Sequence, residues 1–219
     1  MLTKNMSNSA LICRLSGQRY PYEIHRGLNP LLVLQLREQW EAEKAKILRQ
    51  ILDDYPKAAE DNELFYEQIL AHGLADFGWR WLDKAMVLNT DEYHWFFLKA
   101  DEKIQAVCII YHPKASRLDG DRIFYVDYVA SAYWNRDRPG HAKQFGSVSR
   151  ILISHASHFA INILGYRPGF SLHSLPTAEG YYKSLGMIEF EADVDKENLR
   201  YYEAPPAVAD QLASEAHHG

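Results

Sequence analysis

A change from loop to helix occurs within the stretch Lys143-Gln144-Phe145-Gly146-Ser147-Val148-Ser149-Arg150-Ile151-Leu152. Residues 132–145 are polar and rich in turn formers, and apolar residues at helical spacing follow Gly146. A glycine turn that feeds a helix after a strand presents backbone N–H groups and the positive end of the helix dipole to an anion such as a pyrophosphate. Plain helix capping is the alternative interpretation of the glycine taken alone.

Strand-like runs surround this stretch. Residues 93–99, 105–111 and 122–131 are rich in β-branched and aromatic residues and are separated by turn signals, which predicts an antiparallel meander. After the helix at Gly146, strands are expected at 169–173, 187–190 and 198–203, with a short helix at 176–185. The sequence therefore predicts a mixed, mostly antiparallel sheet flanked by helices, an α+β (α/β) fold.

The first 90 residues read differently. A short strand is expected at residues 9–15, and Asn29-Pro30 can cap a long amphipathic helix over residues 30–53. Helical spacing resumes from Leu64 to about residue 88, where Gly73 and Gly78 argue for a broken helix. We expect one domain over residues 1–205, with helices in residues 1–90 and the sheet in 91–205. A tail follows at 206–219, as a peripheral helix or disordered.

Two motifs resemble one known family. The loop Lys143 to Leu152 is similar to the coenzyme A loop of the GNAT superfamily of acyl-CoA-dependent N-acyltransferases, and Ala178 to Met187 is similar to its downstream Ala, Phe-Tyr and Gly-Phe signature. The two occur in the family's order and spacing. Lys143 replaces the usual Arg or Gln, and Val148 replaces a small residue. Leu175 stands where Asn is frequent, so that contact is either absent or made by Ser174.

The resemblance implies a set of site residues. Tyr182 is expected to protonate the leaving thiolate, and Asp127 to take the proton of the attacking amine. The predicted coenzyme contacts are Val129, Ala130, Ser131, Lys143, Phe145, Gly146, Ser147, Val148, Ser149 and Ser174. Taken without the resemblance, Tyr181 and Tyr182 read as packing aromatics, and Asp127 reads equally well as a hydrogen-bonded strand carboxylate.

These features imply an N-acetyltransferase that moves an acetyl group from acetyl-CoA directly to an amine. The acceptor could be a small molecule, a peptide or protein amine, or an aminoacyl-tRNA. The alternative is a catalytically inactive coenzyme-binding or protein-interaction module, and the long amphipathic helices could support a homodimer. The formal net charge of -5 argues against nucleic acid as a partner.

Composition narrows the remaining classes. No apolar run approaches the roughly 20 residues of a membrane span and no secretory signal opens the chain, so a cytoplasmic protein without a membrane partner is expected. Cys13 and Cys108 read as buried thiols. His155 and His158 could join His141 or His173 around a metal, but solvated histidines are favoured and no metal is expected.

Two further features bear on the acceptor. Carboxylates between the first two helices, Asp53, Asp54, Glu60, Asp61 and Glu63, permit a cationic amine, although a solvated loop is favoured. Trp79, Trp81, Trp95, Phe96 and Phe97 could line an acceptor pocket, although core packing is favoured.

Overall fold

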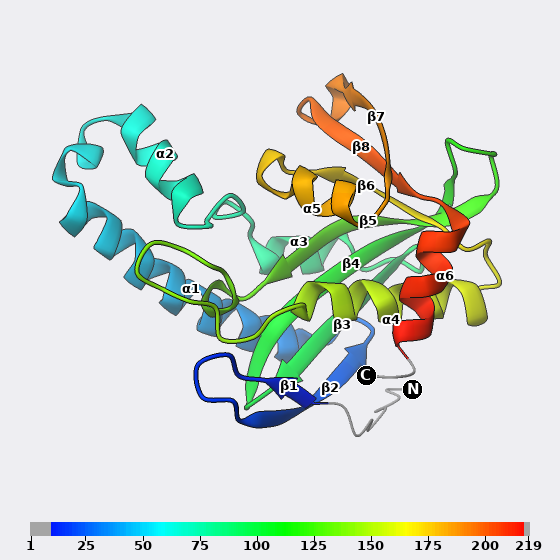
Figure 1. The fold of residues 1–219 in the computed structure, drawn as a ribbon, viewed down its shortest axis with the longest axis horizontal. Helices are drawn as coiled ribbons and strands as arrows, with labels where there is room; N and C mark the ends of the chain where they lie inside the picture. Colours follow the sequence, from blue (N-terminus) through cyan, green and yellow to red (C-terminus); the bar gives the residue numbers. More distant parts are fainter. Residues whose placement is uncertain (1–9, 217–219) are drawn as a thin grey trace.

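The computed structural model describes residues 10–216 (Figure 1). The predicted strand 9–15 and the predicted tail 206–219 each extend outside these residues. Within them, eight strands form a sheet in the order β1-β2-β3-β4-β5-β6-β8-β7. The strands are β1 Ala10–Ile12, β2 Arg19–Arg26, β3 Tyr93–Ala100, β4 Lys103–Ala115, β5 Arg122–Ser131, β6 Phe170–Ser174, β7 Ile188–Asp193 and β8 Leu199–Ala204. Every neighbouring pair is antiparallel except β5 with β6, which confirms the mixed, mostly antiparallel sheet.

The helices lie on both faces of this sheet. The α-helices are α1 Pro30–Asp54, α2 Asn62–Ala71, α3 Trp81–Val87, α4 Val148–Asn162, α5 Glu179–Ser184 and α6 Pro206–Glu215. Short 3-10 turns are η1 Pro56–Ala59, η2 Tyr133–Asn135, η3 Pro176–Ala178 and η4 Val194–Lys196. Figure 1 shows α4 and α6 on one face of the sheet and α1 on the other.

Two hydrophobic clusters explain why the middles of β3 and β4, residues 95–98 and 106–110, are apolar without interruption. Phe96 and Cys108 face a cluster that includes Leu152 of α4, while Trp95 and Val107 face a second cluster around α1. Because successive side chains of a strand point to opposite faces, a strand covered on both sides needs apolar residues at every position. The continuous runs at 93–99 and 105–111 are therefore central strands.

The long first helix follows its local signals. The Asn29 side chain accepts from the N–H groups of Leu31 and Leu32, at 3.0 and 3.4 Å, and Pro30 occupies the first turn. Trp40 is buried, and its indole N–H donates to the Ile104 carbonyl over 2.9 Å. α1 thus begins at the predicted residue and is fixed to β4.

Between α1 and β3 the chain forms two separate helices, and it does not form one continuous helix to residue 88. α2 ends at Ala71, α3 begins at Trp81, and Gly73 between them adopts a φ of +69°. An L side chain is strained at that φ, so the glycine allows the helix to end there. The resulting α2–α3 connection, residues 72–80, is free to fold over the sheet.

The structure adds one strand to the sequence interpretation and shows the helical one of the two forms predicted for the tail. β2 was not predicted, although Tyr22 and Ile24 are buried in alternation; Pro21 beside them lowers β propensity. α6 lies within the predicted tail, and it packs on α4 with Ala209, Leu212 and Ala213 buried. Arg150 of α4 also pairs with Glu215 through two contacts of 2.8 and 2.6 Å.

Candidate active site

The two parallel strands at the middle of the sheet separate. β5 and β6 are paired from Phe124 with Phe170 to Val126 with Leu172, and beyond this point β5 continues to Ser131 without β6 as a partner. The backbone edge of β5 that faces β6 is therefore open from Asp127 onward. Unpaired strand edges offer N–H and C=O groups to an extended ligand.

A β-bulge marks the point of separation. In the β4–β5 register, Ile109 pairs with Tyr128 and Ile110 pairs with Val126, so Asp127 is the additional residue. A bulge bends its strand and redirects the side chain of the inserted residue. Asp127 therefore lies at the point where β5 turns away from β6.

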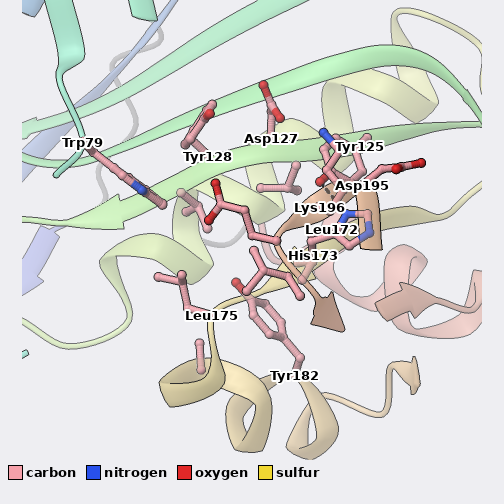
Figure 2. Close-up of a pocket in the computed structure, with 15 residues that line it drawn as sticks. Trp79, Tyr125, Asp127, Tyr128, Leu172, His173, Leu175, Tyr182, Asp195 and Lys196 are labelled. Atoms are coloured by element: carbon pink, nitrogen blue, oxygen red, sulfur yellow. Dashed lines mark hydrogen bonds between the residues drawn. The ribbon is translucent and has the colours of Figure 1, made fainter. Parts of the chain in front are cut away.

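Two cavities meet along the open edge. Cavity A, of about 370 Å³, lies between β5, β6 and the β7–β8 connection and includes Asp127 and His173 in its wall (Figure 2). Cavity B, of about 500 Å³, lies between the end of β5, α4, α5 and the α2–α3 connection. Both are lined by Trp79, Val129, Leu175, Ala178 and Tyr182. The shared walls make A and B one continuous cleft.

Asp127 is the predicted base, and the structure shows its surroundings. It lines cavity A, and within residues 10–216 its carboxylate takes part in no hydrogen bond. Burial raises the pKa of Asp127, opposed by the charges of Lys196, Lys84 and His173. A carboxylate that binds its proton more tightly is a better base.

Tyr182 lies on the opposite wall. The residue is 6% exposed, and Figure 2 shows its hydroxyl end pointing from α5 into the space toward β5. Burial raises the pKa of Tyr182 above its ordinary value. The phenol therefore keeps its proton at neutral pH and can donate it.

Lys84 of α3 is a neighbour of cavity A that sequence reasoning missed. Its ammonium lies 3.2 Å from the centroid of the Tyr128 ring and 5.3 Å from that of Trp79, two residues of the cavity wall. Burial lowers the pKa of Lys84 to about 8, although the charge of Asp127 opposes the shift. Only the folded α2–α3 connection brings this lysine to β5, so no local sequence signal could reveal it.

In the loop before α4 the backbone is open to a ligand, but two of the predicted side chains are not. Ser147 adopts a left-handed φ of 61°, and no side chain caps the helix. The first N–H groups of a helix have no intrahelical partner, so the start of α4 can accept an anion. Phe145 and Val148 were predicted as coenzyme contacts, but both side chains are buried in the core and the Phe145 N–H donates to Asn135 Oδ1 over 3.1 Å. Their side chains cannot reach a ligand.

Arg14 lies over the same loop. Its backbone N–H donates to the Gln144 carbonyl over 2.8 Å, and a Cβ placed on Gly146 would come within 2.8 Å of its guanidinium. The β1–β2 connection therefore adds a cation next to Gly146. Sequence reasoning missed Arg14 because it is separated from the loop by 130 residues.

Ion pairs and hydroxyls build the wall of cavity B. Arg136 forms two contacts with Asp76, of 2.6 and 2.8 Å, and its Nε donates to the Ser131 carbonyl over 2.9 Å. The hydroxyls of Ser131 and Ser149 are 2.7 Å apart, and Lys143 Nζ lies 2.6 Å from Asp137. Among the predicted contacts, Val129, Ala130, Ser131, Lys143 and Ser149 line this cavity.

Ser174 is not placed as predicted. It is fully buried at the end of β6, its hydroxyl donates to the Leu175 carbonyl over 2.9 Å, and neither cavity includes it. Leu175 itself lines both cavities. The residue at the position of the family's Asn thus adds an apolar side chain to the wall of the cleft.

The acidic segment is also remote from the cleft. Asp61 caps α2 through the N–H groups of Glu63 and Leu64, both at 3.0 Å, and no carboxylate of residues 53–63 lines cavity A or B. The carboxylates of cavity A are Asp127, Asp195 and Glu197. Of the aromatic candidates only Trp79 lines the cleft, while Trp81, Trp95, Phe96 and Phe97 are core residues.

Other ligand classes find little support in the described part of the chain. Within residues 10–216, no group of three or more His, Cys, Asp or Glu side chains could hold a metal ion. Of the histidines considered for such a site, His173 is instead bonded to Tyr125 and Asp193. No helix of these residues is long and apolar enough to cross a membrane.

Comparison with known proteins gives matches among solved structures alone. No protein-family model and no curated protein matches the sequence. The fold is similar to that of acetyltransferases. A protein of the GNAT family from Desulfovibrio desulfuricans is 13% identical with a TM-score of 0.48, covering 84% of this chain and 98% of its own.

Two other structures extend this similarity. An acetyltransferase of the GNAT family from Listeria monocytogenes is 12% identical with a TM-score of 0.44, covering 90% of this chain and 99% of its own. The Campylobacter jejuni N-acetyltransferase PseH is 13% identical with a TM-score of 0.43, covering 84% and 96%. At these values the likeness concerns the fold and does not extend to substrate.

Proposed function

We propose that the protein transfers an acetyl group from acetyl-CoA to an amine by direct attack within the cleft. The observation that carries the proposal is the meeting of a base, an open strand edge and an acid at the separation of β5 from β6. Asp127 lines one cavity, Tyr182 lines both, and the free edge of β5 runs between them. Acyl transfer from a thioester to an amine is accelerated by a base, by hydrogen-bond donors to the carbonyl and by an acid for the leaving thiolate.

Cavity B suits the donor. The Val129 and Ala130 backbone can pair with the amide-containing arm of acetyl-CoA as an added strand would. Gly146 and Ser147 line neither cavity, but they precede Ser149 of the cavity B wall, and the uncapped start of α4, with Arg14 beside Gly146, can take the pyrophosphate. The chain supplies binding and orientation here, which places the thioester near the junction of the two cavities.

Cavity A suits the acceptor. An amine held between β5 and the β7–β8 connection would face Asp127, whose raised pKa favours proton uptake during attack. As the C–N bond forms and the C–S bond breaks, Tyr182 gives its proton to the thiolate. Both groups are partly removed from water, which strengthens their electrostatic influence on the reacting atoms.

Thiol release tests this proposal directly. The unaltered protein is incubated with acetyl-CoA and pools of amines, free thiol is followed with a colorimetric reagent, and thermal stabilisation by acetyl-CoA is measured in parallel. We expect amine-dependent thiol release together with a concentration-dependent rise in Tm. The absence of both effects would contradict the proposal.

A binding module is the second candidate function. It is favoured by one observation: Arg136 already occupies the Ser131 carbonyl, so one predicted contact of the donor is used inside the protein. This candidate expects the rise in Tm with acetyl-CoA but no thiol release with any amine. The same pair of measurements therefore separates the two functions.

A further inference from the structure

Three polar side chains form a chain behind cavity A. Tyr125 of β5 and His173 of β6 both line the cavity, and the Tyr125 hydroxyl lies 2.7 Å from His173 Nδ1 (Figure 2). On the other side of the ring, His173 Nε2 lies 2.7 Å from Asp193 Oδ2. The function proposed for Asp127 and Tyr182 makes no use of this chain.

The partners define the proton positions. Hydrogen bonds from Arg117 and His173 lower the pKa of Asp193, so its carboxylate is ionised and can only accept. His173 Nε2 must therefore carry a proton and donate it. Burial lowers the pKa of His173 despite Asp193, which leaves the ring neutral at pH 7, with Nδ1 free to accept from the Tyr125 hydroxyl.

Both ring nitrogens are thus engaged. A proton from the cavity can reach His173 only through the Tyr125 oxygen, whose lone pairs are not used by its bond to Nδ1. At the far end, the Asp193 side chain is 28% exposed and is also held by Arg117. The chain therefore offers a proton from cavity A a path to a neutral histidine whose charged form the ionised Asp193 supports.

The proposed reaction needs such a route. An alkylamine reaches the site as an ammonium ion and loses two protons before it becomes an amide, whereas the departing thiolate takes up one. One proton per turnover must therefore leave the cleft. Asp127 and Tyr182 can exchange the second proton between nitrogen and sulfur, but they return to their starting states and remove none.

The wall of cavity A also helps an ammonium ion to lose its proton. The Lys84 ammonium on the Tyr128 ring is an alkylammonium in this environment, and burial there lowers its pKa to about 8. A substrate ammonium placed against the same aromatic wall would be weakened as an ion for the same reason.

We propose that Tyr125, His173 and Asp193 form a proton relay that removes the first proton of an alkylammonium acceptor in cavity A. The ammonium gives its proton to the Tyr125 oxygen while Tyr125 gives its own to His173 Nδ1, leaving a free amine and an imidazolium paired with Asp193. After the amide has left, the imidazolium gives its Nδ1 proton back through Tyr125 to water in the cavity, which restores the starting tautomer. This inference rests on the proposed acetyl transfer.

The charges around His173 permit both of its states. Asp193 of β7 stabilises the imidazolium, while Lys196 of η4 and Arg117 of the β4–β5 connection oppose it. Asp127 of β5 faces His173 from the cavity, and the Tyr201 ring of β8 packs 5.2 Å from it. Because the two cations oppose the charge that Asp193 stabilises, the imidazolium of His173 releases its proton readily after receiving it.

The test compares two nucleophiles with acetyl-CoA: n-butylamine, which is an ammonium ion at neutral pH, and hydroxylamine, which is largely neutral there. His173→Gln keeps a polar side chain but cannot accept a proton. We expect it to lower kcat/KM for n-butylamine by about 100-fold and for hydroxylamine by less than about 3-fold. In the unaltered protein, kcat/KM for n-butylamine should also show an acid limb with an apparent pKa below 6.5, which the variant lacks.

His158→Gln on α4 is the matched control, because it removes a histidine outside the cleft, and it should change neither rate. Equal losses with both nucleophiles in His173→Gln would assign His173 a structural role and overturn the relay while leaving acetyl transfer intact. If the unaltered protein released no thiol with either nucleophile or with any other amine, both the relay and the proposed acetyl transfer would be overturned. Long-range 1H–15N spectra add a readout free of turnover: His173 protonated on Nδ1 at pH 7 would also overturn the relay.

Discussion

Cavity A and cavity B share five residues of their walls but are built from different kinds of interaction. Cavity A is surrounded by groups whose pKa values are displaced by burial, Asp127, His173 and the neighbouring Lys84. Cavity B is framed by fixed pairs, Arg136 with Asp76 and Lys143 with Asp137, and by strand backbone. Groups with displaced pKa values exchange protons near neutral pH, whereas paired charges hold geometry. The difference supports the proposal that A takes part in proton transfer and B in binding the donor.

The largest effect is expected from breaking the frame of cavity B. Asp76→Ala would leave Arg136 largely buried without its carboxylate, and we expect a loss of about 3 kcal/mol in the free energy of unfolding, measured by urea denaturation. Asp137→Ala, which breaks a pair whose carboxylate side chain is 65% exposed, should cost less than about 1 kcal/mol. Similar losses in the two variants would show that Asp76 does not act as a buried anchor.

Removal of one hydroxyl at the junction of the two cavities should lower the turnover rate and leave the binding of acetyl-CoA unchanged. Tyr182→Phe removes one hydroxyl from the wall shared by A and B, and we expect kcat for thiol release to fall about 100-fold while thermal stabilisation by acetyl-CoA is retained. Tyr181→Phe is the matched control on the same helix, with a side chain that is 40% exposed. Unchanged turnover in Tyr182→Phe would remove the phenol from the mechanism.

A change in the loop before α4 should weaken binding and leave the rate nearly unchanged. Gly146→Ala places a Cβ within 2.8 Å of the Arg14 guanidinium, so the arginine must move, and we expect the Kd for acetyl-CoA to rise about 10-fold with little change in kcat. The calorimetric control is Gly180→Ala, since a Cβ at Gly180 meets no atom within 4 Å. Equal affinity in the two variants would mean that the pyrophosphate does not use this loop.

The same contrast separates what the sequence could predict from what it could not. Asp127 and the edge Val129 to Ser131 were found because they share one strand with an unmistakable apolar pattern, and Tyr182 because it lies in a local motif. Arg14, Asp76 and Lys84 come from the first 90 residues, and each reaches the site through a turn between elements. Periodicity describes a strand or a helix, but it does not say where a connection folds back.

The directions of the side chains within the predicted motif have a related cause. The loop at Gly146 is matched as consecutive residues, yet Phe145 and Val148 turn into the core while Ser147 faces outward, because Ser147 adopts a left-handed φ. Ser174 was expected to replace a missing side chain, but alternation along β6 buries it. A linear motif places backbone correctly and leaves the direction of each side chain to the local dihedral angles.

The smallest effect concerns Lys84 and the environment of cavity A. Its pKa in the folded protein, about 8, is lower than the 10.5 of an exposed lysine, so folding disfavours the ammonium. The sign follows: this cost is fully present below pH 8, declines as the folded lysine loses its proton, and is gone above pH 10.5. Lys84→Met keeps an apolar side chain of similar length against Tyr128 and has no proton to lose.

We therefore expect Lys84→Met to be more stable than the unaltered protein at pH 7, by about 1 kcal/mol after allowance for solvent screening at a half-buried site, with the difference shrinking toward pH 10. Urea denaturation at pH 7, 8, 9 and 10 measures it. Lys46→Met on α1, whose side chain is 73% exposed, should show no such dependence. A constant difference across this range would mean that the aromatic wall holds an ammonium ion without weakening it, and an acceptor amine bound there would need a stronger base than a neutral imidazole.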